Sequence, residues 1–176
     1  MWLRIPLRSP AQMTAFKVAA IATVVLMGAP ARAAQSDSES GSFSALYGTW
    51  TGAGLIKKAN GSSERIRCRS TDERAGTVSL RLHLRCASDS YNFDLSATVI
   101  DEGGSISGVW SETTRNANGN LQGRSSGNGR QVQVVAQGPA FTANLTLNTR
   151  GDKQTIVMLS PGAEVTEVSI ALDRAK

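Results

Sequence analysis

The chain carries few side chains that could build a catalytic centre or a metal site. Its 176 residues include one histidine, His83, and two cysteines, Cys68 and Cys86. Structural zinc sites and iron–sulfur clusters need three or four thiolate or imidazole ligands, so we expect no metal ion. A Ser-His-Asp hydrolase would need His83 as its base, beside a positioned serine and a carboxylate, and no motif marks such a serine. We therefore predict that the protein is not an enzyme.

The expected positions of His83 and Glu112 give neither residue a catalytic role. His83 alternates with Leu82 and Leu84, and side chains of a strand alternate between its two faces, so the imidazole should face solvent. Glu112 follows Trp110 by two residues and should share its face. A carboxyl group buried there would be an acid of raised pKa. A glutamate near a strand end more commonly lies at the rim of a barrel, and we favour the rim.

The two cysteines are most simply explained as one disulfide, because disulfides form in exported proteins. Cys68 shares its face with Ile66, and Cys86 shares its face with Leu84, so both thiols should point to the apolar side. A turn near residues 72–76 predicts that the cysteines are offset rather than directly opposite. A bulge or a wider loop would then have to bring them together.

A basic outer surface follows from the same alternation. Residues 57–85 hold eight basic and three acidic side chains. On two neighbouring strands, the apolar side chains point to one face and the basic side chains point to the other. We call the second surface the basic face, and it consists of Arg65, Arg67, Arg69, Arg81, His83 and Arg85. Like charges that face each other destabilise a sheet, so we expect either interleaved acids (Glu64, Asp72 and Glu73) or an anionic partner such as envelope lipid headgroups. A solvated surface that resists aggregation is the simpler alternative.

The chain from Tyr47 onward is organised as short strands. Segments rich in Val, Ile, Leu, Thr and aromatic residues alternate with Gly, Asn, Asp and Ser clusters, which is typical of all-β proteins. We expect eight to ten strands over residues 47–174, and their short turns make neighbours antiparallel. An open sheet would leave two exposed edges. We therefore predict a single antiparallel up-and-down β-barrel, with a two-sheet β-sandwich as the alternative.

The opening of this domain resembles the calycin-like barrels. Gly48-Thr49-Trp50, followed by Gly-Ala-Gly at 52–54, is similar to the Gly-x-Trp of the first strand in lipocalins, fatty-acid-binding proteins and nitrobindin-like proteins. The resemblance implies that Trp50 closes the barrel floor and packs against an arginine of a late strand, for which Arg174 is the candidate. Nitrobindin-like proteins hold haem through a histidine late in the chain. The single histidine here is His83, so we expect no haem and no other cofactor.

Two segments precede the barrel domain. Residues 1–33 contain basic residues, an apolar stretch at 18–29 and Ala-Arg-Ala at 31–33, which is the pattern of a secretory signal peptide. Twelve helical residues span only about 18 Å, against about 30 Å for a hydrocarbon core, so we expect no transmembrane segment after cleavage. Residues 34–46 are rich in serine and poor in apolar side chains, and they predict a flexible tether.

Cleavage of the signal peptide would also change the charge of the protein. The segment holds four basic and no acidic residues, so its removal lowers the net charge from +5 to +1. Polyphosphate binding needs many uncompensated cations, and we therefore expect no nucleic-acid partner. We expect the mature protein in the bacterial periplasm, with secretion as the alternative.

We expect the mature barrel to bind a ligand rather than to catalyse a reaction. Aromatic rings predicted to face the lumen would hold a small apolar or amphipathic ligand of the cell envelope: Trp50, Phe93, Trp110 and Phe141. The alternative is a periplasmic interaction protein, similar to a protease inhibitor, that acts through its N-terminal tail or the basic face. An outer-membrane barrel is not expected, because arginines on the outer face are incompatible with lipid.

Overall fold

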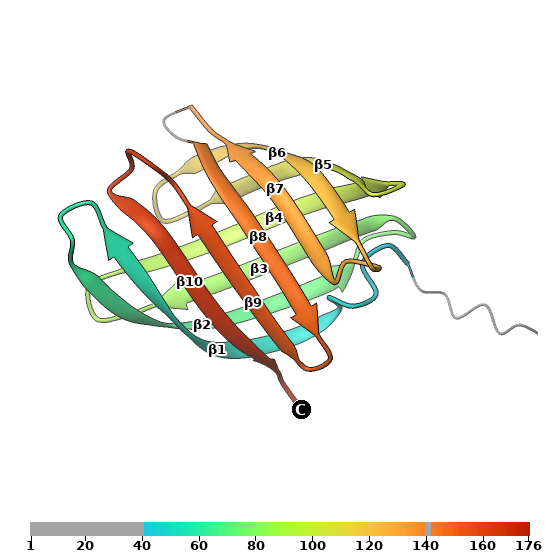
Figure 1. Ribbon diagram of the computed structural model, residues 1–176, viewed down its shortest axis with the longest axis horizontal. Coiled ribbons are helices and arrows are strands. Elements are labelled where there is room, and N and C mark those ends of the chain that lie inside the picture. Colours follow the sequence, from blue (N-terminus) through green and yellow to red (C-terminus); the bar gives the residue numbers. More distant parts are fainter. Residues whose placement is uncertain (1–40, 140–141) are drawn as a thin grey trace, which may run out of the picture. The chain divides into compact units, whose positions relative to one another are not determined.

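The computed structural model describes residues 41–139 and 142–176, and these residues form ten β-strands (Figure 1). The strands are β1 (Gly48–Lys58), β2 (Ser63–Arg74), β3 (Ser79–Ala87), β4 (Asn92–Glu102), β5 (Ser105–Glu112), β6 (Ala117–Ser126), β7 (Gln131–Gln137), β8 (Thr142–Arg150), β9 (Lys153–Leu159) and β10 (Val165–Arg174). The predicted signal peptide, 1–33, and the first part of the predicted tether, 34–40, lie outside the described residues.

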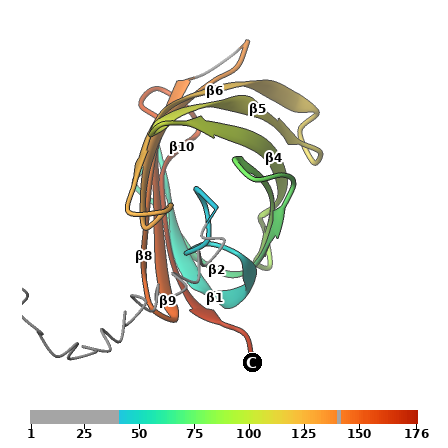
Figure 2. The same cartoon turned by 90° about the vertical axis from the view of Figure 1, so that its right-hand side faces the viewer.

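The ten strands close into one barrel. Each strand pairs antiparallel with its neighbours in sequence, and β10 pairs with β1. The order around the barrel is therefore the order of the chain, which is the up-and-down arrangement (Figures 1 and 2). The predicted closed antiparallel barrel is confirmed at the upper end of the expected strand count, and the β-sandwich alternative is wrong. Closure removes the two edges that an open sheet would expose.

The two ends of the barrel are built from different links. We call the mouth the end formed by the links β1–β2, β3–β4, β5–β6, β7–β8 and β9–β10, and the floor the opposite end, where β1 begins and β10 ends. The link between β4 and β5 is a tight turn. Gly103 and Gly104, between β4 and β5, have φ values of 64° and 91°, which glycine adopts at no steric cost and which a two-residue hairpin turn requires.

Residues 41–47, which we call the plug, lie inside the floor end of the barrel (Figure 2). Phe43 and Leu46 are 0% and 1% exposed and belong to the hydrophobic core. The backbone N–H of Ala45 donates to the carbonyl oxygen of Asn128 in the β6–β7 turn. The predicted tether is therefore corrected for residues 41–46: two apolar side chains one turn apart are enough to anchor this serine-rich segment, because the barrel offers both of them a buried site.

Trp50 and Arg174 join the plug to the barrel floor. Trp50 is fully buried, and its indole Nε1 donates to the carbonyl oxygen of Leu46 at 2.8 Å. Arg174 is the register partner of Trp50 on β10, and its guanidinium carbon lies 4.0 Å from the centroid of the indole ring. The same guanidinium donates to the carbonyl oxygens of Tyr47 and Ala45. Arg174 thus has the position that the calycin resemblance implies.

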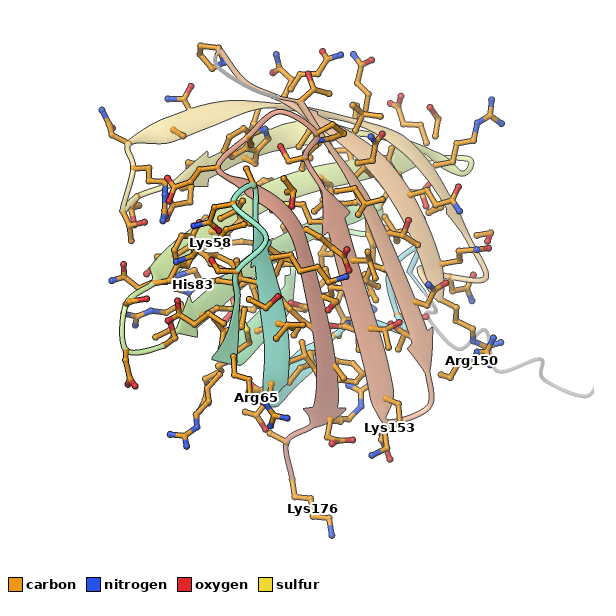
Figure 3. The ribbon with its side chains drawn as sticks, turned by 60° about the vertical axis from the view of Figure 1, so that its left-hand side comes forward. Lys58, Arg65, His83, Arg150, Lys153 and Lys176 are labelled. Carbon is orange, nitrogen blue, oxygen red and sulfur yellow. A yellow bond between two sulfur atoms is a disulfide. The ribbon has the colours of Figure 1, made fainter. Side chains whose placement is uncertain are left out.

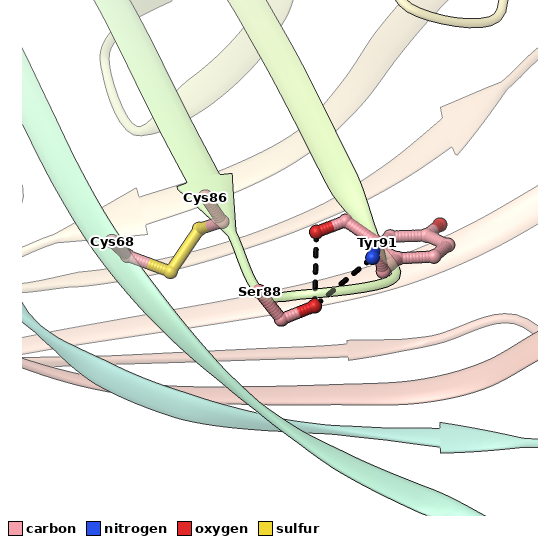
Figure 4. Close-up of a disulfide and its surroundings, with 4 residues drawn as sticks. All are labelled: Cys68, Cys86, Ser88 and Tyr91. Carbon is pink, nitrogen blue, oxygen red and sulfur yellow. Dashed lines mark hydrogen bonds between the residues drawn. A yellow bond between two sulfur atoms is a disulfide. The ribbon is translucent and has the colours of Figure 1, made fainter.

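Cys68 and Cys86 form a disulfide between β2 and β3 (Figure 4). The two residues are directly opposite in register, with 4.1 Å between their Cα atoms, so the predicted offset is wrong and no bulge is needed. The reason lies in the turn: β2 continues to Arg74, and the link to β3 is 75–78 rather than 72–76. Both cysteines are buried on the inner side of the wall.

We expect neither cysteine of the mature protein to react with a thiol reagent. The protein would be denatured without reductant, treated with a maleimide and weighed as an intact chain, and the expected result is no added mass. The same treatment after reduction should add two labels, which is the control. A label added before reduction would contradict the disulfide.

Candidate ligand-binding cavity

A cavity of about 340 Å³ occupies the lumen of the barrel. Its wall consists of apolar side chains from β3 to β10, and Phe43 and Leu46 of the plug line it as well. The plug therefore closes the floor end of the lumen, since both residues are fully buried there. The arrangement is a one-ended apolar chamber within the described part of the chain.

Strand alternation explains why the wall is apolar. Along β4, the residues that line the cavity are Phe93, Leu95, Ala97 and Val99. The polar residues between them point to the outer face, as the period of two in a strand requires. The small side chain of Ala97 is the register partner of Trp110 on β5, so a small residue accommodates a large one on the inner surface.

Glycines on β6 bring two strands unusually close. Gly123 follows the inward-facing Leu121 at i+2, and a Cβ added to it would lie 2.0 Å from the carbonyl oxygen of Gln133 on β7. Only a residue without a side chain permits this approach, which is a common feature of strongly bent barrel strands.

The polar side chains that line the cavity lie together at its mouth. Glu112 ends β5 and Arg115 belongs to the β5–β6 link, while Ser160 and Glu164 belong to the β9–β10 link. The guanidinium carbon of Arg115 lies 4.3 Å from the centroid of the Tyr91 ring, which also lines the cavity. The cavity therefore combines an apolar interior with a polar entrance, as ligand sites commonly do.

Glu112 holds a turn at the mouth. Its carboxylate accepts hydrogen bonds from the backbone N–H groups of Asp94 at 2.9 Å, Thr114 at 3.1 Å and Arg115 at 2.8 Å. Burial raises the pKa of this carboxyl group, but the hydrogen bonds outweigh burial, and the pKa lies below its ordinary value. Glu112 therefore lies at the predicted rim, but it is buried and lines the cavity, and its lowered pKa does not fit the alternative of an acid with a raised pKa.

Two of the four predicted pocket residues line the cavity. Phe93 and Trp110 do so. Trp50 does not line it, because its ring is packed between the plug and Arg174. Phe141 lies outside the described residues.

Tyr91 and Arg115 also line the cavity, although neither was predicted as a pocket residue. Tyr91 stands two positions before Phe93, so the alternation that places Phe93 inside could have placed Tyr91 there too. No such signal was available for Arg115, because it lies in a turn, where strand alternation assigns no face.

The basic face lies on the outer surface of β2 and β3, as predicted. All five of its arginines are exposed, and Figure 3 shows Arg65 extending away from the barrel wall. Arg69 and Arg85 are direct register partners, so two guanidinium groups occupy neighbouring positions on adjacent strands. Such a like-charged pair is unfavourable unless counter-charges lie nearby.

Asp94 of β4 supplies a counter-charge that the sequence analysis missed. The Nε2 atom of His83 lies 2.6 Å from Asp94 Oδ1, and the Nε atom of Arg85 lies 3.1 Å from Asp94 Oδ2. Of the acids expected within the basic face, Glu73 is the register partner of Arg81. The basic face therefore retains an excess of positive charge.

The other two expected acids lie elsewhere, so their assignment to the basic face is wrong. Glu64 accepts hydrogen bonds from Ser88 and Ser90 at the mouth, and these hydroxyl groups lower the pKa of Glu64 to about 2. Asp72 lies on the inner side of β2, where it is 2% exposed. An even-numbered position on β2 faces inward, as Ile66 and Cys68 do, which explains this placement.

Asp72 belongs to a buried polar cluster at the floor. Ser70 Oγ donates to Asp72 Oδ1 at 2.6 Å. Burial raises the pKa of Asp72 to about 6, although the hydrogen bond from Ser70 and the charge of Arg174 act in the opposite direction. Asp72 does not line the cavity, so it is separate from the candidate ligand site.

Residues 41–139 and 142–176 contain no group of three or more His, Cys, Asp or Glu side chains that could hold a metal ion. The same residues include no helix long and apolar enough to cross a membrane. His83 lies on the outer face and does not line the lumen. The chemistry available inside the cavity is therefore apolar contact, with hydrogen bonds and charges at the mouth.

Comparisons with known proteins agree with this architecture. No family model and no curated protein sequence matches the chain. Among solved structures, Rv2717c from M. tuberculosis is similar with a TM-score of 0.62 at 14% identity, over 76% of this chain and 94% of that one. The S-type phycobiliprotein lyase CPES from Guillardia theta is similar with a TM-score of 0.54 at 8% identity, over 76% of this chain and 90% of that one. At these identities the likeness concerns the fold, and with the closed ten-stranded topology it supports a calycin-like barrel.

Proposed function

We propose that the protein is an exported, non-enzymatic barrel that binds a small apolar or amphipathic molecule of the cell envelope in its lumen. The observation that carries the proposal is the cavity of about 340 Å³ with an apolar wall. Its volume falls within the range of about 300–1,000 Å³ that is usual for small-molecule sites. An apolar cavity of about 150 Å³ already accommodates benzene.

The size of the cavity argues against a simple packing defect. Protein interiors are packed about as densely as organic crystals, and voids larger than a water molecule are few. The free-energy cost of an empty apolar cavity rises with its volume. The small side chain of Ala97 helps to keep the lumen open, where a larger side chain would fill it. A ligand that occupies this space would recover the missing contacts.

The polar groups of the lumen support binding rather than catalysis. Glu112 already accepts three backbone hydrogen bonds, and its pKa is lowered. A general acid or base at neutral pH needs a pKa closer to the working pH. His83 pairs with Asp94 on the outer face and does not line the lumen.

Two features support export. The disulfide between Cys68 and Cys86 is compatible with an oxidising compartment such as the periplasm. The sequence of residues 1–33 has the pattern of a signal peptide.

We expect the mature protein to retain envelope lipids. It would be incubated with a lipid extract of bacterial envelopes, separated from free lipid and analysed by native mass spectrometry. The expected result is a bound small molecule that is released on denaturation. A protein that emerges without any adduct from extracts of both envelope membranes would contradict the proposal.

The basic face supports a second candidate function, which is binding to an anionic envelope lipid surface. Four of its arginines, Arg65, Arg67, Arg69 and Arg81, make no ion pair within the described part of the chain, whereas Arg85 pairs with Asp94. A surface with such an excess of positive charge attracts anionic headgroups. Action through the N-terminal tail has less support, because Phe43 and Leu46 are held inside the barrel.

We expect reversal of two basic-face charges to abolish binding to anionic vesicles at low salt. Arg65 and Arg67 suit this test, because Arg67 has Ala53 and Ala87 as register partners and the change disrupts no ion pair. The double variant Arg65→Glu/Arg67→Glu should lose binding to phosphatidylglycerol vesicles. Its matched control changes two exposed arginines of other strands by the same charge: Arg124→Glu/Arg150→Glu. Equal binding by both double variants would contradict this second candidate.

A further inference from the structure

The polar lining of the cavity is confined to one end, and this fixes how an amphipathic ligand would be oriented. The polar side chains that line the cavity within the described residues come from mouth links and strand ends at 112–115 and 160–164, together with Tyr91. The deeper wall offers apolar side chains only, and a polar group placed there would lose its hydrogen bonds to water. An apolar chain would therefore enter first, and its polar head would stay at the mouth.

The charges around that head do not favour an anion. Arg115 is the single cationic side chain among the described residues that line the cavity. Its Nη1 atom lies 3.7 Å from Glu112 Oε2 and donates to the carbonyl oxygen of Asn92 at 3.1 Å and to Thr114 Oγ1 at 2.9 Å. Its positive charge is thus balanced by a carboxylate of the same site.

Glu164 adds a further negative charge to the mouth. It lines the cavity, is exposed, and makes no ion pair within the described part of the chain. Glu112 and Glu164 together carry two negative charges against the one positive charge of Arg115. A third negative charge on a ligand head would meet net repulsion at this entrance, whereas an uncharged or cationic head would not.

Tyr91 gives an uncharged head a hydrogen-bonding partner. Its ring lies under the Arg115 guanidinium and makes an edge contact with Phe93 at 6.3 Å between centroids. Burial raises the pKa of the Tyr91 hydroxyl, and the carboxylates of Glu164 and Glu112 act in the same direction. The hydroxyl group therefore stays protonated and can both donate to and accept from an alcohol or an amide.

We infer that the cavity selects amphiphiles with an uncharged or cationic head and discriminates against carboxylates such as fatty-acid anions. This inference rests on the proposed lumen-binding function and names the ligand class for it. The inference rests on the charges at the mouth. Arg115, the one arginine among the described residues that line the cavity, is already paired with Glu112, whereas Glu164 makes no ion pair within the described part of the chain.

Three ligands with the same ten-carbon chain test the inference: decanol, decylammonium and decanoate. Binding would be measured by displacement of the uncharged dye N-phenyl-1-naphthylamine from the mature protein near neutral pH. We expect decanol and decylammonium to bind roughly five- to tenfold more tightly than decanoate, the size of one unit-charge repulsion at a few Å near solvent. Raising the salt concentration should reduce this difference in affinity, because exposed charges are screened.

Variants of Glu164 make the test specific. Glu164→Gln should improve decanoate binding relative to decanol binding, and Glu164→Lys should reverse the order of decanoate and decylammonium. Glu167→Gln is the matched control, since Glu167 pairs with Lys57 on the outside of the barrel at 2.9 Å. Decanoate that binds as tightly as decanol, or an order that Glu164→Lys leaves unchanged, would overturn the inference. A protein that binds the dye but none of the three chains would overturn it as well, whereas failure to bind the dye itself would refute the proposed function.

Discussion

Replacement of Trp50 by alanine should lower the free energy of unfolding by roughly 3 to 5 kcal/mol, the range for emptying a packed aromatic site. Trp50 is fully buried, and its ring carries the guanidinium of Arg174 at 4.0 Å. The substitution would also leave the carbonyl oxygen of Leu46 without its donor. Urea unfolding followed by circular dichroism would measure the change.

A more conservative variant separates the contributions at this position. Trp50→Phe keeps an aromatic ring for Arg174 but removes the hydrogen bond to Leu46, so it should cost about 0.5 to 1.5 kcal/mol from the lost bond plus a smaller packing loss. A loss below about 1 kcal/mol for Trp50→Ala would contradict a structural role. It would show that the plug and the floor do not depend on this ring.

Asp72→Asn should stabilise the protein at neutral pH. Burial raises the pKa of Asp72 from its ordinary 3.8 to about 6, so between these values the folded state holds a proton that the unfolded state has released. Stability from this residue is therefore fully present below about pH 4 and is lost as the pH rises to about 6. Two pKa units correspond to a difference of about 3 kcal/mol, which the asparagine variant should recover above about pH 7.

The pH dependence distinguishes this effect from ordinary repacking. Asp72→Asn and the unchanged protein should have similar stability near pH 4 and should diverge above it, as measured by urea unfolding at several pH values. Glu64 and Glu112 have lowered pKa values, so their contribution to stability is lost as the pH falls. Both residues are present in the unchanged protein and in the Asp72→Asn variant, so the difference in stability between these two proteins does not contain that contribution. Glu73→Gln, at the neighbouring exposed position, is the matched control and should show no such divergence. A constant difference at all pH values would contradict the prediction.

The strands could be predicted from the sequence because they follow a period of two between recognisable turns. Alternation assigned Leu82, His83 and Leu84 to the correct faces, and the short links left closure as the arrangement without free edges. The register of the cysteines could not be predicted, because a turn placed a few residues early displaces every cross-strand pair. The burial of Phe43 and Leu46 was also missed. Local composition indicated a tether, and the site that buries them exists only after the barrel closes.

The candidate site could be predicted only in part, for a related reason. Phe93 and Trp110 lie on strands, where alternation gives a face. Arg115 lies in a turn, and its contact with Tyr91 depends on how two mouth links approach each other. Asp94 was likewise missed as the partner of Arg85, since the pairing of β3 with β4 determines it.

The central claim is that the lumen holds a ligand, and a dye titration with two matched variants tests it most directly. Val134 lines the cavity, whereas its neighbour Val135 faces the outside, so Val134→Trp fills the lumen and Val135→Trp adds the same ring to the surface. N-phenyl-1-naphthylamine fluorescence would report binding to both variants and to the unchanged protein. We expect saturable binding that Val134→Trp abolishes and Val135→Trp preserves, while both variants remain folded. Dye binding that persists in a folded Val134→Trp protein, or that is absent from the unchanged protein, would contradict a ligand site in the barrel lumen.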